Sequence, residues 1–200
     1  MNKTYNPANH HKLYGLVNKS GINSPKRTTS VGDLVRSKYT EDPNELWQMV
    51  KDNSMNDLDE EVERCIRYVN ENDPSIPAED VQGFIWKLFT EWSIQGFKAE
   101  RRAIEWLNKT YDDCVFSPAN SECDNKYSVD IMCSKNGSLA AGIQVKPESY
   151  RNAPNWQVKA DKNKNEKFVK QYGVPVKYLY YTIKKKGDNK TIKFEWDVNN

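Results

Sequence analysis

Cysteine and histidine are scarce in this sequence, and neither is arranged as a metal-binding motif. The four cysteines are Cys65, Cys114, Cys123 and Cys133, and the two histidines are His10 and His11. Without a C-x-x-C pair or a histidine cluster, a zinc site is not expected. A signal-peptide pattern and a membrane-spanning apolar run are also missing. We therefore expect a cytoplasmic protein that contacts no membrane and keeps free thiols, with disulfides as the less favoured alternative.

A strong charge of one sign is missing too, so composition alone does not demand a nucleic-acid partner. The 200 residues include 30 basic and 28 acidic ones, for a formal net charge of +2. Acidic residues gather between Glu41 and Asp80, whereas lysine is frequent after Lys146. This distribution predicts a basic face beside a more acidic region.

Length and helix breakers predict one compact protein with two parts. A hydrophobic content of 37% in 200 residues suffices for one sizeable core but not for two large domains. Asp73-Pro74 and Pro77 interrupt the helical periodicity. We therefore predict a loop and helical region over residues 1–77 and a core over residues 78–200.

Apolar residues recur at helical spacing through the first half of the chain. The pattern predicts helices around residues 31–35, 43–50, 58–69 and 79–107. Thr29 or Ser30 is a candidate cap for the first, and Gly96 is a candidate break in the last. Residues 1–12 show no periodicity and are expected to form a loosely docked arm. Residues 14–39 are expected to form a loop that opens the first helix.

A β-hairpin is predicted between Tyr127 and Tyr150. Residues 128–133 favour a strand, Asn136-Gly137 is a strong turn signal, and residues 139–146 run into a second strand. This pairing brings Asp130 close to Lys146. Because alternate residues of a strand share a face, Gln144 and Lys146 project together.

Further elements surround this hairpin. Residues 114–116 precede it as a short strand that ends at Pro118. Residues 155–171 follow it as a lysine-rich helix candidate, and residues 174–183 and 191–196 read as strands. On the helix before the hairpin, Glu100 is either a functional acid or a surface partner of its neighbouring arginines.

The hairpin carries side chains suited to phosphodiester hydrolysis. Magnesium prefers oxygen ligands, and Asp130, the Gln144 amide and the backbone carbonyl of Val145 could supply them. Lys146 would then orient the attacking water or neutralise developing charge. The alternative is that Asp130 and Lys146 form an ordinary surface ion pair.

The order of elements over residues 96–183 resembles the PD-(D/E)XK nuclease core. The resemblance implies a mixed central β-sheet flanked by helices, an α/β (α+β) fold, that holds an acid and an (E/Q)-x-K pair. Glu100 matches the helix acid of that family, since it ends a G-x-x-x-E segment that begins at Gly96. Two departures are Val129 in place of proline and Gln144 in place of an acid.

Residues 16–35 and 142–155 are also similar to type II restriction endonucleases of the MjaI kind. That resemblance implies magnesium-dependent cutting of double-stranded DNA at the palindrome CTAG. A palindrome presents two equivalent strands, so a homodimer is expected. Residues 1–77 would then serve in DNA recognition and packing. A repair or junction-resolving nuclease, and an inactive DNA-binding module on the same fold, remain alternatives.

Loops rather than the sheet are expected to contact DNA. Arginine and asparagine suit guanine and adenine edges, and lysine suits phosphates. The candidates before the core are Asn18, Lys19, Asn23, Lys26 and Arg27, for which a solvated loop is the alternative. Those after the catalytic strand are Ser149, Tyr150, Arg151, Asn152, Asn155 and Lys159.

Overall fold

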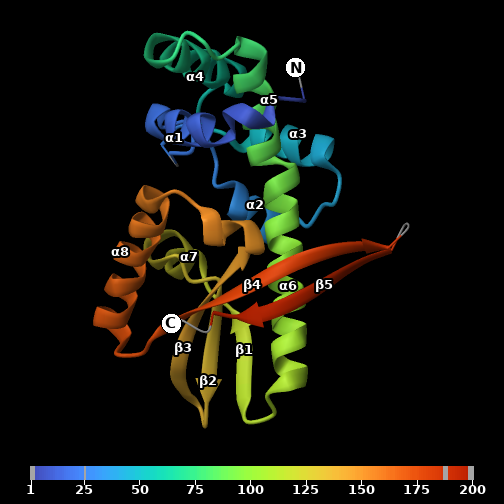
Figure 1. Ribbon diagram of the computed structural model, residues 1–200, viewed down its shortest axis with the longest axis vertical. Coiled ribbons are helices and arrows are strands. Elements are labelled where there is room, and N and C mark those ends of the chain that lie inside the picture. The colour runs from blue at the N-terminus through green and yellow to red at the C-terminus, as the bar shows by residue number, and fades with distance from the viewer. Residues whose placement is uncertain (1–2, 25, 187–188, 198–200) are drawn as a thin grey trace. The chain divides into compact units, whose positions relative to one another are not determined.

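The computed structural model describes residues 3–24, 26–186 and 189–197, which fall into two compact units (Figure 1). The first unit is Met1–Phe97 and the second is Lys98–Asn200. The predicted boundary near residue 77 differs from this division. Helix α5, which begins just after Pro77, buries Phe84, Ile85 and Phe89 in the core of the first unit and so belongs to it.

Helices make up the first unit over its described residues. They are η1 (Pro7–Asn9), α1 (His10–Ser20), α2 (Val31–Ser37), α3 (Pro43–Asn53), α4 (Leu58–Asn72), α5 (Ala78–Phe89) and the start of α6 (Glu91–Thr110). The predicted helices are confirmed, and Ser30 caps α2 by accepting a hydrogen bond from the Asp33 N–H. The break in the last predicted helix lies at Thr90, however, and Gly96 lies inside α6.

The loosely docked arm predicted over residues 1–12 is wrong for residues 10–12, and the loop predicted from residue 14 is wrong for residues 14–20. These residues form α1, which ends at Gly21 in the left-handed conformation. Leu13 and Val17 are fully buried, one helical turn apart. Leu16 packs against the same core, but Gly15 and the polar neighbours weaken the helical signal of this segment.

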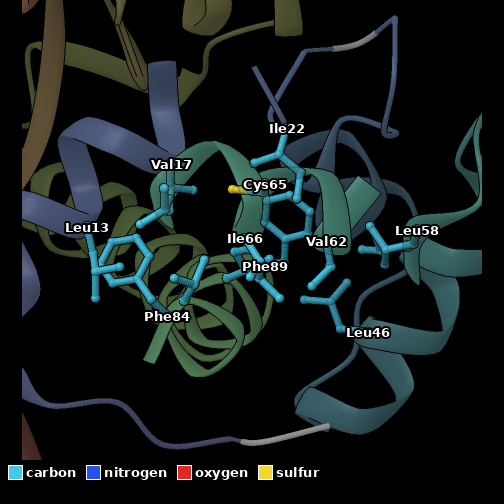
Figure 2. Close-up of a cluster of buried hydrophobic side chains, with 14 of the residues drawn as sticks. Leu13, Val17, Ile22, Leu46, Leu58, Val62, Cys65, Ile66, Phe84 and Phe89 are labelled. Carbon is cyan, nitrogen blue, oxygen red and sulfur yellow. The ribbon is translucent and has the colours of Figure 1, made fainter. Parts of the chain in front are cut away.

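One apolar core joins the helices of the first unit (Figure 2). Leu13 and Val17 of α1 lie with Ile66 of α4 and with Phe84 and Phe89 of α5 in the same cluster. All five are at most 6% exposed. Burial of such a cluster supplies the main stabilisation of the unit.

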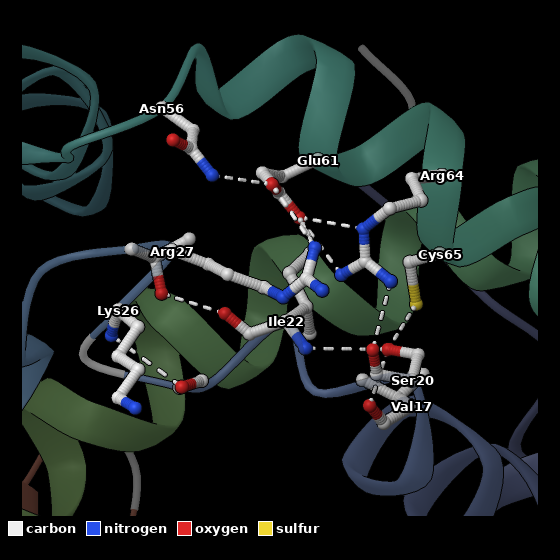
Figure 3. Close-up of polar contacts among 11 residues, drawn as sticks. Val17, Ser20, Ile22, Lys26, Arg27, Asn56, Glu61, Arg64 and Cys65 are labelled. Atoms are coloured by element: carbon white, nitrogen blue, oxygen red, sulfur yellow. Dashed lines mark hydrogen bonds and ion pairs between the residues drawn. The ribbon is translucent and has the colours of Figure 1, made fainter.

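A buried glutamate ties the segment after α1 to α4 (Figure 3). Glu61, only 6% exposed, lies 2.8 Å from Arg64 Nη2 and 3.4 Å from Arg27 Nη1, and its Oε1 accepts a hydrogen bond from Asn56 at 2.7 Å. Arg64 in turn donates to the Ser20 carbonyl at 2.8 Å. Burial favours a higher pKa for Glu61, but its partners, Arg64 first, outweigh that effect and lower the pKa.

Glu61→Gln is expected to lower the free energy of unfolding by about 1.5–3 kcal/mol at pH 7, because the charged partners lose their acceptor. A lowered pKa stabilises the fold above the ordinary glutamate pKa, and that stability is lost as the pH falls through the lowered value. The gap between wild type and variant should therefore shrink in acid. Urea denaturation measures it, with Glu63→Gln, an exposed position of α4, as the control. Equal stability of Glu61→Gln and wild type at pH 7 would contradict this account.

A mixed sheet forms the second unit. Its strands within the described residues are β1 (Cys114–Pro118), β2 (Ile131–Lys135), β3 (Ser138–Pro147), β4 (Val176–Lys186) and β5 (Asn189–Trp196), ordered β1-β2-β3-β4-β5. Only the β3–β4 pair is parallel; the other pairs are antiparallel. The helices are α7 (Ser121–Tyr127), η2 (Glu148–Asn152) and α8 (Asn155–Tyr172), with the end of α6. The predicted mixed sheet flanked by helices, a restriction-endonuclease-like core, is confirmed.

Helices cover both faces of this sheet. From α6, Ala99, Ala103 and Leu107 pack with Ile143 and Val145 of β3. On the other face, Phe168 of α8 packs with Val129, and a Cβ added at Gly142 would lie 2.9 Å from Phe168. Because β3 and β4 are parallel, a crossover must connect them, and α8 is that crossover (Figure 1).

The hairpin turn matches its prediction, but the strand before it begins later than predicted. Asn136 and Gly137 have φ values of 53° and 77°, as a two-residue type I′ turn requires. Residues 128–130 precede β2 rather than belong to it. An unpredicted helix, α7, occupies Ser121–Tyr127 and is capped by the Asn120 side chain, which accepts from the Cys123 N–H.

Candidate active site

Asp130 lies immediately before β2 and is bound to the backbone of β3. Its N–H donates to the Ile143 carbonyl at 2.9 Å, and its Oδ2 accepts from the Val145 N–H at 2.7 Å. Protein atoms crowd the carboxylate, and this desolvation raises the pKa of Asp130 to about 7. Lys146 and the Val145 N–H oppose the rise, whereas the charges of Asp124 and Asp161 add to it.

Lys146, the predicted catalytic lysine, lies between an acid and an aromatic ring. Its Nζ is 3.1 Å from Asp161 Oδ2 and 4.8 Å from the centroid of the Tyr150 ring. The side chains of Lys146 and Asp161 are only 21% and 17% exposed. The salt bridge of Lys146 is therefore formed with Asp161, which the sequence analysis did not select.

Gln144 is the most enclosed of the predicted site residues, at 1% exposure. Its Oε1 is buried without a hydrogen-bond partner among the described residues. Buried polar atoms are almost always hydrogen-bonded, so an orphaned oxygen points to a missing ligand. Pairing of Ile131 with Ile143 places Asp130 opposite Gln144 at the end of the β2–β3 ladder.

The donor set fits a magnesium ion by its chemistry. Asp130 offers a carboxylate, Gln144 an orphaned amide oxygen and Val145 a backbone carbonyl, and oxygen is the element that Mg²⁺ prefers. Three or more His, Cys, Asp or Glu side chains do not come together as a metal site anywhere in the described part of the chain. Neutral oxygens would therefore have to complete the coordination. Glu100 lies on α6 beside Ala99, and its role as a ligand stays a prediction.

Asp161 and its neighbours are the part of the site that sequence reasoning missed. On α8, Val158, Asp161, Asn165 and Phe168 follow each other at spacings of three and four residues, so they share the face that meets the sheet. An acid at an inward position of a lysine-rich helix was the available signal. Asp161 Oδ2 also accepts a hydrogen bond from the Tyr150 hydroxyl at 2.6 Å.

Several residues predicted to contact DNA from the first unit lie in a helix or are held by other side chains. Asn18 and Lys19 belong to the last turn of α1, and the Asn23 side chain donates to Asn18 Oδ1 at 2.7 Å. Arg27 is bound to Glu61. Only Asn23, Lys26 and Arg27 of this set lie in the connection between α1 and α2.

The predicted contacts of the second unit lie on η2 and α8. Ser149, Tyr150, Arg151 and Asn152 form most of η2, while Asn155 and Lys159 are on the first turns of α8. Tyr150 is only 8% exposed, so the structure places it inside the site rather than on a free loop. Arg151 stacks on the Tyr180 ring at 3.8 Å and donates to Glu148 at 2.8 Å.

The five-stranded mixed sheet flanked by helices is consistent with a restriction-endonuclease-like fold. The sequence model of the MjaI restriction endonuclease family matches residues 14–194, and the chain belongs to that family. It is therefore a nuclease whose substrate is DNA. Searches of curated proteins and of solved structures gave no match. Among the described residues, every helix is too short or too polar to cross a bilayer.

Asp130→Asn is expected to stabilise the metal-free protein at pH 8 by roughly 1–3 kcal/mol. A raised carboxylate pKa means that the folded state binds more protons than the unfolded state between the ordinary aspartate pKa of 3.8 and about 7. The wild type therefore loses stability as the pH rises through that interval. The Asp130→Asn variant does not, because its side-chain amide stays neutral.

Thermal unfolding at pH 4 and pH 8 measures this effect, with the exposed Asp112→Asn as control. The gain should vanish at pH 4, where the wild-type carboxyl is also neutral. A lower melting temperature of Asp130→Asn at pH 8 would contradict the proposed burial cost.

Proposed function

We propose that this restriction endonuclease hydrolyses double-stranded DNA in a magnesium-dependent and sequence-specific reaction centred on Asp130, Gln144, Val145 and Lys146. The observation that carries the proposal is the orphaned Gln144 Oε1 at the end of the strand pair that bears Asp130. A desolvated carboxylate and an unpartnered oxygen destabilise the metal-free fold, and a cation offsets both costs.

Each residue has a distinct task in this proposal. A bound Mg²⁺ would supply an activated water and offset charge on the scissile phosphate. Asp130, the Gln144 amide and the Val145 carbonyl hold the ion, with Glu100 as a further acid. Lys146 places its ammonium group where the attacking water or the phosphate oxygens gain charge, and there it stabilises the transition state.

Recognition of a palindrome such as CTAG by a homodimer is part of the proposal. A twofold dimer meets the two strands of a palindrome with the same surface. The residues proposed to contact DNA are Asn18, Lys19, Asn23, Lys26 and Arg27 in the first unit and Ser149, Arg151, Asn152, Asn155 and Lys159 in the second. If sedimentation shows a single subunit bound to cognate DNA, the proposal of a homodimer is wrong.

A cytoplasmic location is also part of the proposal, and the four free cysteines support it.

Plasmid digestion in Mg²⁺ followed by sequencing of the ends tests the activity. Lys146→Ala and Asp130→Ala are expected to lower the cleavage rate by at least about 100-fold, because each removes a group that acts on the transition state or its metal. Lys135→Ala, an exposed lysine at the end of β2, is the matched control and should cut normally. Full cutting by both site variants would refute the assignment.

The fragment pattern separates the other nuclease functions. Discrete fragments with a common end sequence support restriction, whereas a smear, or cutting of branched DNA alone, favours repair or junction resolution. DNA binding without cleavage in either Mg²⁺ or Mn²⁺ would favour a degenerate binding module.

Metal binding is tested apart from cleavage through Gln144. Gln144→Leu is expected to abolish the rise in melting temperature that Mg²⁺ or Mn²⁺ gives the wild type, since a ligand oxygen is lost. Gln144→Glu adds a carboxylate and should increase that rise. An unchanged metal response in Gln144→Leu, measured by thermal unfolding over a metal titration, would exclude the amide as a ligand.

A further inference from the structure

Asp161 makes contacts that the proposed catalytic set leaves unexplained. Its Oδ2 lies 3.1 Å from Lys146 Nζ and accepts the Tyr150 hydroxyl at 2.6 Å, while its Oδ1 accepts the Ser128 hydroxyl at 3.5 Å. We propose that Asp161 is a positioning residue that holds the Lys146 ammonium group in its working place and keeps it from pairing with Asp130. This inference rests on the proposed function of Lys146.

Two partners restrict the lysine from different directions. The carboxylate of Asp161 pairs with the ammonium group, and the face of the Tyr150 ring lies 4.8 Å from the same nitrogen. A free lysine side chain populates many rotamers, and a catalytic lysine must lose that freedom. Contacts with Asp161 and Tyr150 remove that freedom before DNA binds, which is how a site becomes preorganised.

Charge balance gives Asp161 its second task. Asp130 accepts a hydrogen bond from the N–H of Val145, the residue next to Lys146, and lies opposite Gln144, which shares its face of β3 with Lys146. If Asp161 were absent, Asp130 would become the strongest remaining attraction for the half-buried ammonium group. Pairing of Lys146 with Asp130 would occupy the carboxylate that the metal requires.

The helix that carries Asp161 is fixed to the sheet one turn further on. Asn165, 7% exposed, donates to the Tyr127 carbonyl at 2.9 Å and accepts the Tyr178 hydroxyl at 2.7 Å. Phe168 is fully buried in the next turn. Asp161 therefore sits on a rigid support, as a positioning residue requires.

Three variants separate the tasks of the carboxylate. Asp161→Asn keeps an oxygen that can accept from Tyr150 but removes the charge that faces Lys146. Asp161→Glu keeps the charge on a longer side chain. Tyr150→Phe keeps the ring and removes only the hydroxyl. Glu166→Gln, which removes an exposed charge from the same helix, is the matched control.

The readouts are the single-turnover cleavage rate at saturating enzyme, the dissociation constant for DNA without metal, and the melting temperature. Asp161→Asn is expected to lower the rate on the order of 100-fold with an unchanged dissociation constant. Asp161→Glu should recover part of that loss, and Tyr150→Phe should lose less than Asp161→Asn. In a Lys146→Ala background, Asp161→Asn should have no further effect on the rate.

The outcomes distinguish this inference from the proposed function. Wild-type cleavage by Asp161→Asn, together with inactive Lys146→Ala, would overturn the positioning role alone. Full activity of Lys146→Ala would overturn the proposed function. If Asp161→Asn does not fold, the cleavage rates of Tyr150→Phe and Asp161→Glu test the inference instead. If Asp161→Asn lowers the cleavage rate by the same factor with Lys146 present and with Lys146→Ala, Asp161 has only a structural role and the inference is overturned.

Discussion

The candidate site depends on one costly arrangement, the desolvation of the partly exposed Asp130 carboxylate against the backbone of β3. The Val145 N–H at 2.7 Å fixes one of its oxygens, and desolvation still raises its pKa to about 7. A carboxylate in such surroundings favours any nearby cation. Lys146 lowers that cost in part, but its own salt bridge is with Asp161. The proposed metal ion would offset the rest of that cost.

Sheet topology brings these groups together from distant parts of the chain. The two-residue turn at Asn136 and Gly137 joins β2 to β3 and brings Asp130 to the strand of Gln144 and Lys146. The parallel β3–β4 pair then requires a crossover, and α8 serves as one. Its inward face presents Asp161 and Asn165 on the side opposite to α6. In the role proposed for Asp161, this helix would contribute to the chemistry as well as to the packing.

Local signals in the sequence predicted the hairpin and its catalytic candidates, because turn type and strand parity depend on neighbouring residues. Asn136-Gly137 set the turn, and the spacing of Gln144 and Lys146 set their common face. Asp161 was missed because its contact with Lys146 spans a crossover that no local pattern records. Tyr150 was assigned to a DNA-reading loop because its burial arises from contacts with Tyr178 and Tyr180, far along the chain. Helix α7 was missed because it is short and offers few apolar residues, whereas α1 was missed because Gly15 stands among its apolar residues and resembles a loop signal.

The central claim is that the orphaned Gln144 oxygen and the Asp130 carboxylate hold the catalytic metal. Anomalous diffraction from crystals soaked in Mn²⁺ tests this claim most directly. Mn²⁺ scatters anomalously and shares the preference of Mg²⁺ for oxygen ligands. The account predicts an anomalous peak bonded to Asp130, to the Gln144 side chain and to the Val145 carbonyl. A metal bound elsewhere in the second unit, with Gln144 Oε1 still unliganded, would contradict it.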